Sequence, residues 1–131
     1  MKKNTTAVGN MGEMVAQQYL ADAGFTLVET NYWKKWGEID IVARKDNKVH
    51  FIEVKTVSHE TRKDLEYAVS CGTWRPEELV HRFKLHQIHK ALQTWITENK
   101  YTGDFQIDVI AVRIVPRETF ATVKCISNII A

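Results

Sequence analysis

The strongest constraint on the fold is a pair of strands that meet at a two-residue turn. Residues 38–43 and 49–57 carry the alternating, β-branched pattern that is typical of strands. Between them stand Asp46 and Asn47, two residue types that tolerate the positive φ angles of a tight hairpin turn. The sequence therefore predicts an antiparallel hairpin whose register can be counted outward from that turn.

The predicted register brings two carboxylates together. It places Asp40 opposite Glu53, with Cβ atoms about 4.5 to 5.5 Å apart on one face. Lys55 shares that face, because residues two apart along a strand point the same way. Facing carboxylates need a compensating cation, and a hard divalent metal accepts oxygen ligands from such a pair. A plain ion pair of Lys55 with these acids is the competing interpretation. Val49 and Phe51 on the same face argue against a fully solvated surface.

Helical periodicity flanks this hairpin on both sides. Residues 8–24 place apolar side chains along one side of a helix, and Gly24 is a suitable stop. A second helix is expected from about Pro76 to residue 99, with Lys84 in the middle of its apolar stripe. Three further segments have the pattern of strands, namely residues 25–30, 107–115 and 120–126. We therefore expect an α/β fold in the order α-β-β-β-α-β-β, with a mixed β-sheet flanked by helices.

Two connections lack a clear period. Residues 31–37 are expected to form a loop, in which Trp33 and Trp36 flank Lys34 and Lys35. Such a combination can stack on unpaired bases while the cations hold phosphates, but aromatic side chains that simply pack are the competing interpretation. Residues 58–74 predict a mobile or partly helical connection.

Composition and charge limit the class of protein. A chain of 131 residues with 44% hydrophobic and 26% charged residues fits one globular domain over residues 1–131. The net charge of +2 is small for a nucleic-acid coat protein, so any site for a polyanion must be local. No run approaches the roughly 18 apolar residues of a membrane span, and no signal-peptide core follows Met1. We therefore expect a cytoplasmic protein that makes no membrane contact.

The order of these motifs resembles a nuclease superfamily. Glu13 in the first helix, Gly-Glu-Ile-Asp at residues 37–40, Glu-Val-Lys at residues 53–55 and Lys84 in the later helix look like the PD-(D/E)XK superfamily. More closely, the chain resembles the YraN family of small bacterial endonuclease-like proteins over nearly its whole length. The closer match includes Tyr19-Leu20, Gly24-Phe25, Asn31-Tyr32, Ala91 and Asp-Val-Ile-Ala at residues 108–111. The order is also similar to that of archaeal Holliday junction resolvases.

This resemblance implies a restriction-endonuclease-like fold and a metal-dependent endonuclease that hydrolyses DNA, including branched structures such as Holliday junctions. Asp40 and Glu53 would hold Mg²⁺ or Mn²⁺, with the Val54 carbonyl as a further ligand. Lys55 would orient the attacking water or help to deprotonate it, and Glu13 would complete the metal shell.

Nucleic-acid contacts are expected from a few basic and aromatic residues. Lys84 would bring positive charge to the scissile phosphate. Lys34, Lys35 and Trp36 are the further candidates for contact with DNA, because their loop lies just before Asp40 in the chain. Junction resolution needs two cuts, so that activity would suggest a homodimer.

Departures from the family pattern keep two alternatives open. Val57 and Gln106 stand where YraN-like sequences usually carry arginine, so two phosphate contacts are missing. The first alternative is a catalytically weak or inactive nucleic-acid-binding module with a nuclease fold. The second is a structural or partner-binding protein whose acidic cluster is only an ion-pair network.

Overall fold

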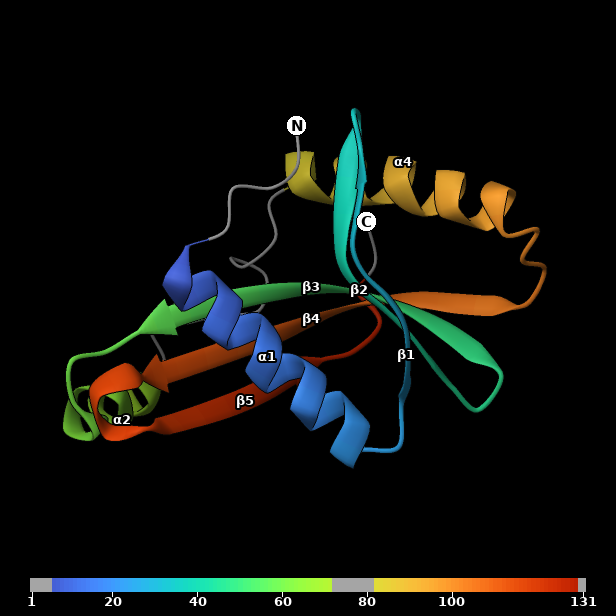
Figure 1. Cartoon of the computed structure of the whole chain (residues 1–131). Helices are drawn as coiled ribbons and strands as arrows, with labels where there is room; N and C mark the ends of the chain where they lie inside the picture. The colour runs from blue at the N-terminus through green and yellow to red at the C-terminus, as the bar shows by residue number, and fades with distance from the viewer. Residues whose placement is uncertain (1–5, 72–81, 130–131) are drawn as a thin grey trace.

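The computed structural model describes residues 6–71 and 82–129, which form a five-stranded sheet with helices on both sides (Figure 1). The strands stand across the sheet in sequence order: β1 (Thr26–Lys34), β2 (Gly37–Lys45), β3 (Lys48–Ser58), β4 (Asp104–Val115) and β5 (Phe120–Ile126). Strands β3 and β4 are parallel, and the other neighbouring pairs are antiparallel. The expected mixed sheet and the order α-β-β-β-α-β-β are confirmed.

The helices are α1 (Ala7–Asp22), α2 (Arg62–Ser70) and α4 (Arg82–Glu98), and a short 3-10 turn, η1 (Pro116–Glu118), joins β4 to β5. Helix α1 begins at Thr6, whose Oγ1 accepts a hydrogen bond from Gly9 N at 3.0 Å, and it is followed by Gly24 at a φ of 91°. Helix α4 belongs to the crossover that the parallel strands require. Its predicted start near Pro76 lies outside the described residues. No helix in the described ranges is long and apolar enough to cross a membrane.

Each of the two long helices closes a hydrophobic cluster against one face of the sheet. On one face the cluster joins α4 to β3 through Ile88, Leu92, Trp95, Val49 and Phe51. On the other face it joins α1 to the sheet through Ala16, Leu20, Ile52, Val54 and Ile110. Because alternate residues of a strand point to opposite faces, Glu53 and Lys55 share the α4 side with Val49 and Phe51.

The predicted hairpin between β2 and β3 is confirmed. Asp46 and Asn47 have φ angles of 52° and 63°, so both adopt the left-handed conformation that a tight turn of this kind needs. Outward from the turn, Lys45 lies opposite Lys48, and the paired positions continue to Ile41 opposite Ile52. This is the register that the sequence predicts.

The loop expected over residues 31–37 is wrong, because β1 continues to Lys34 and leaves only Lys35 and Trp36 as the turn. Contacts with α4 stabilise this extension. The Tyr32 hydroxyl donates a hydrogen bond to Glu98 Oε1 at 2.7 Å, and Trp36 Nε1 donates one to Thr94 Oγ1 at 3.0 Å.

The segment 58–74 contains the short helix α2. Its N-cap is Thr61, whose Oγ1 accepts a hydrogen bond from Asp64 N at 3.1 Å. Within α2, Leu65 is the buried residue. One buried position cannot produce a period, so residues 62–70 carry no clear helix signal in the sequence.

Candidate functional site

Asp40 lies where β2 and β3 separate. The pairing of these strands runs as far as Ile41 opposite Ile52, so Asp40 and Glu53 are the next residues of the two strands. The Asp40 side chain is buried, and its Oδ2 accepts a hydrogen bond from the Val54 main-chain N–H at 2.8 Å. The carboxylate thus takes the place of a main-chain acceptor and is held at the fork between the strands.

Glu53 is paired with a lysine from the helix that covers it. Lys84, in the first described turn of α4, has its Nζ 3.6 Å from Glu53 Oε1 and 3.6 Å from Glu38 Oε1. The side chain of Glu53 is 3% exposed, whereas those of Lys84 and Glu38 are 24% and 21% exposed. The lysine in the apolar stripe of the helix therefore reaches a buried carboxylate, and its charge compensates the cost of burying that group.

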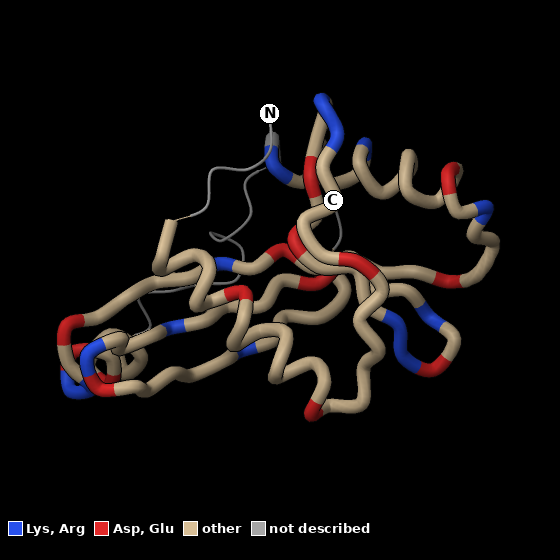
Figure 2. The backbone as a smooth tube through the Cα atoms, in the orientation of Figure 1, with Lys and Arg blue, Asp and Glu red and all other residues tan. Residues whose placement is uncertain are grey.

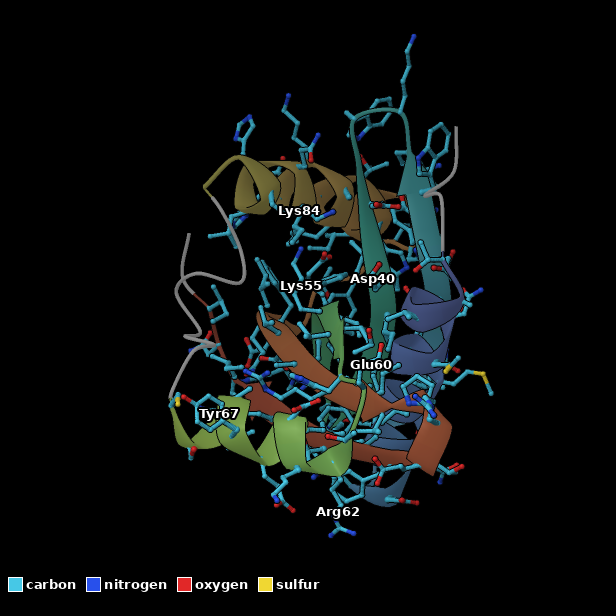
Figure 3. All side chains as sticks on the ribbon, turned by 90° about the vertical axis from the view of Figure 1, so that its left-hand side faces the viewer. Asp40, Lys55, Glu60, Arg62, Tyr67 and Lys84 are labelled. Carbon is cyan, nitrogen blue, oxygen red and sulfur yellow. The ribbon has the colours of Figure 1, made fainter. Side chains whose placement is uncertain are left out.

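Lys55 lies on the same row of β3, two residues beyond Glu53. Its side chain is partly buried, and it is in register with Ala111 of β4, which belongs to the hydrophobic cluster under α4. Figure 3 shows Lys84, Lys55 and Asp40 in the space between α4 and the sheet. The structure thus places Lys84 against Glu53, with Asp40 and Lys55 at nearby positions of β2 and β3, and the part that these residues play in a site stays a prediction.

Glu13 approaches from the other face of the sheet. It is buried in α1, which packs on the opposite side from α4. The helix comes so close to β3 that a Cβ at Gly12 would overlap the Thr56 side chain. Among the residues that the structure describes, no group of three or more His, Cys, Asp or Glu side chains could hold a metal ion. The part of Glu13 in a metal shell therefore stays a prediction.

The remaining donor set still suits a hard divalent cation. Asp40 and Glu53 offer carboxylate oxygens, and the Val54 main-chain carbonyl lies between Glu53 and Lys55 in the chain. Mg²⁺ usually keeps several waters and is bound through one or two carboxylates, so a third protein carboxylate is not required. Two buried carboxylates beside lysines are therefore compatible with Mg²⁺ or Mn²⁺.

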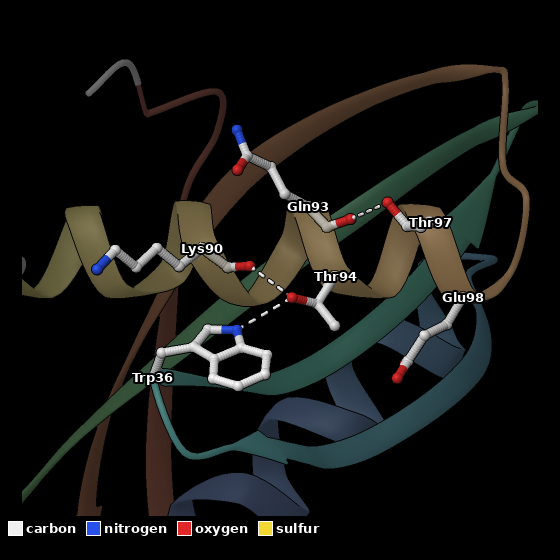
Figure 4. Close-up of a pocket in the computed structure, with 6 residues that line it drawn as sticks. All are labelled: Trp36, Lys90, Gln93, Thr94, Thr97 and Glu98. Carbon is white, nitrogen blue, oxygen red and sulfur yellow. Dashed lines mark hydrogen bonds between the residues drawn. The ribbon is translucent and has the colours of Figure 1, made fainter.

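The predicted nucleic-acid contacts at the tip of the β1–β2 hairpin also hold that tip to α4. Lys34 Nζ lies 2.7 Å from Glu98 Oε2, and this hydrogen bond holds the pKa of the Glu98 carboxyl below its ordinary value. Trp36 donates to Thr94 and forms one wall of a shallow pocket on the outer side of α4 (Figure 4). The Trp36 side chain is still 47% exposed, and Lys35 is exposed beside it. Lys34 and Trp36 therefore each have a partner on α4, and their contact with nucleic acid stays a prediction.

The lysine and arginine side chains of the segment 34–63 do not form one patch. Figure 2 shows their blue segments at the β1–β2 tip, at the β2–β3 turn and at α2, which lie at separate edges of the molecule. Lys84 differs from these because it lies beside the buried Glu53 carboxylate, and Lys55 differs because it is partly buried on the same face of β3. Any site for a phosphate is therefore local, in agreement with the small net charge.

Asp108 is a further buried carboxylate, to which the sequence patterns assign no role. Its Oδ2 lies 2.7 Å from His50 Nδ1, and its Oδ1 accepts hydrogen bonds from Gln106 Nε2 at 2.7 Å and Asn128 N at 2.8 Å. Gln106 also accepts a hydrogen bond from Lys48 Nζ at 3.1 Å. This network ties β3, β4 and the segment after β5 together. Polar residues inside two otherwise apolar strands are the sequence signal that could have revealed it.

Glu38 is the other residue that sequence reasoning left without a role. It precedes Asp40 by two positions on β2, and its carboxylate shares Lys84 with Glu53. The spacing of two residues between Glu38 and Asp40 is the sequence signal that could have revealed Glu38, because residues two apart on a strand project to the same side.

Comparison with known proteins places the chain in a family. Residues 12–112 match the model of the uncharacterised protein family UPF0102. Similar proteins include a UPF0102 protein of Campylobacter jejuni, 37% identical over 105 residues, which are 80% of this chain and 82% of the relative. A UPF0102 protein of Alkaliphilus metalliredigens is 37% identical over 110 residues, 82% of this chain and 86% of the relative. A UPF0102 protein of Trichlorobacter lovleyi is 37% identical over 112 residues, which are 84% of this chain and 80% of the relative. The chain therefore belongs to the UPF0102 family, as its resemblance to YraN proteins predicts.

Proposed function

We propose that the chain is a metal-dependent endonuclease that hydrolyses DNA phosphodiester bonds, with branched structures such as Holliday junctions among its substrates. The observation that carries the proposal is the pair of buried carboxylates, Asp40 and Glu53, at the fork of β2 and β3. Lys84 Nζ lies 3.6 Å from Glu53, and Lys55 follows on the same face of β3. Acidic and basic side chains inside a partly covered region are costly unless they serve a site.

Each residue of this cluster has a defined task in such a reaction. Asp40 and Glu53 would hold Mg²⁺ or Mn²⁺, and the hydrogen bond from Val54 N keeps the Asp40 carboxylate in a fixed position. When bound, the cation supplies positive charge to the phosphodiester and lowers the pKa of a coordinated water. Lys55 would orient the attacking water or help to deprotonate it. Lys84 would stabilise the negative charge that develops on the phosphate oxygens.

Cleavage of end-labelled linear, flapped and four-way DNA in Mg²⁺ or Mn²⁺ tests this proposal. We expect the wild type to cleave and Glu53→Gln to lower the rate by at least about 100-fold, the usual scale for loss of one electrostatic group in a site. Glu60→Gln is the matched control, because it makes the same charge change at a side chain that is 80% exposed. Equal cleavage by wild type and Glu53→Gln in a clean preparation would contradict the proposal.

A second candidate is a DNA-binding module that keeps this fold with little or no turnover. One observation favours it: Gln106 is engaged by Lys48 and Asp108 rather than by the candidate site. Salt-sensitive binding to a four-way junction without cleavage in any divalent ion would support this candidate over the first.

A further inference from the structure

Lys84 contacts two carboxylates that differ strongly in burial. Its Nζ is equally distant, at 3.6 Å, from Oε1 of Glu53 and from Oε1 of Glu38. The Glu53 side chain is almost fully buried at 3% exposure, and that of Glu38 is 21% exposed. The lysine therefore has one partner inside the candidate metal site and one partner at its edge.

We propose that Glu38 is a positioning residue that draws the Lys84 ammonium away from Glu53 when Asp40 and Glu53 bind a divalent cation. This inference rests on the proposed function. An ammonium beside Glu53 repels a divalent cation at the same carboxylate, so the two compete for that site. Glu38 offers the ammonium a second partner within the same distance, which keeps Lys84 at the rim where a phosphate would enter.

The backbone fixes Glu38 and Lys84 close to each other. Gly37, the residue before Glu38, lies so close to α4 that an added Cβ would overlap the Gln87 main-chain carbonyl oxygen. On the helix, Ile88 is one turn after Lys84 and is buried in the cluster between α4 and the sheet. Because the backbone is held in place both beside Glu38 and beside Lys84, the Lys84 ammonium can pass from Glu53 to Glu38 by a change of side-chain rotamer. The helix does not have to move.

The inference makes two opposite predictions for binding of Mn²⁺ in the absence of DNA. Lys84→Gln removes the competing ammonium and should tighten Mn²⁺ binding by about tenfold, which corresponds to about 1.4 kcal/mol. Glu38→Gln removes the alternative partner and leaves the ammonium on Glu53, so it should weaken Mn²⁺ binding by about threefold. In the double variant the effect of Glu38→Gln should disappear, because no ammonium remains to be positioned.

Isothermal titration of the full chain with Mn²⁺ at one fixed pH measures these changes. Lys90→Gln and Glu60→Gln are the matched controls, since both make the same charge changes at exposed positions away from the site. We expect each control to stay within about twofold of the wild type, the range that remote charges produce at ordinary ionic strength. Thermal melts establish that the variants fold, and Lys84→Met replaces Lys84→Gln if the latter does not.

Three results would overturn the inference. One is a Lys84 variant that binds Mn²⁺ no more tightly than the wild type. Another is an equal loss from Glu38→Gln in the wild-type and Lys84→Gln backgrounds, because Glu38 would then act on the metal directly. Each of these two results leaves the proposed function standing if the wild type binds Mn²⁺ and cleaves DNA. Absence of Mn²⁺ binding in both the wild type and the Lys84 variant would overturn the inference and the proposed metal site together.

Discussion

Replacement of Gly37 by alanine should destabilise the fold, although alanine usually stabilises a chain relative to glycine. A Cβ at this position would overlap the Gln87 carbonyl oxygen and lie 3.0 Å from its carbonyl carbon and 3.4 Å from Ala91 Cβ. Non-bonded carbon atoms prefer about 3.5 to 4.0 Å, so β2 and α4 must separate by at least about 0.5 Å. Overpacking of this kind costs about 1 to 3 kcal/mol. With an unfolding entropy of about 2.1 cal/mol/K per residue, the expected loss in Tm is about 4 to 11 °C.

Urea unfolding followed by circular dichroism measures this change in the free energy of unfolding. Gly9→Ala is the matched control, because the Cβ there would meet only one side-chain atom, Thr6 Oγ1 at 3.3 Å, and no main-chain atom of another element. We expect that control to be neutral or to gain about 0.5 kcal/mol. If Gly37→Ala proved as stable as Gly9→Ala, the close contact between β2 and α4, and with it the fixed approach of Glu38 to Lys84, would be refuted.

Two further predictions concern stability. Lys45→Met removes the hydrogen bond that Lys45 Nζ donates to Ala23 O, at 2.7 Å, at the end of α1. This substitution should lower the free energy of unfolding by about 1 kcal/mol. An unchanged midpoint of urea unfolding would contradict this expectation. Burial, and then the charge of Arg113, lowers the pKa of His59 from its ordinary value of 6.5, so the unfolded chain binds more protons than the folded one. The contribution of His59 to the free energy of unfolding is fully present above pH 6.5, and it is lost as the pH falls from 6.5 through the lowered pKa of His59. His59→Gln should therefore flatten the fall of Tm in acid, and an identical pH profile would show that the His59 shift is absent.

The positions of Asp40 and Glu53 at the centre of the candidate site could be predicted because the signal for them is local. Asp46 and Asn47 favour one kind of turn, and that turn fixes the pairing of β2 and β3 as far as Ile41 opposite Ile52. Since the side-chain period of a strand is two, the positions of Asp40 and Glu53 follow from the count alone.

The parts that could not be predicted depend on contacts between distant segments. The continuation of β1 to Lys34 is stabilised by Glu98, and the turn at Trp36 by Thr94, both on α4. Neither partner is visible in the local pattern of residues 31–37, which contains no strand alternation strong enough to override its loop-like composition. The contact between Glu38 and Lys84 could not be predicted for the same reason, because Lys84 comes from α4.

Crystals soaked in Mn²⁺ and measured at the manganese absorption edge test most directly whether Asp40 and Glu53 form a divalent-cation site. We expect an anomalous peak between the two carboxylates, within about 2.5 Å of an oxygen of each, with the Lys84 ammonium shifted toward Glu38. A peak at another place, or no peak with Lys84 still beside Glu53, would contradict a metal site at the fork of β2 and β3.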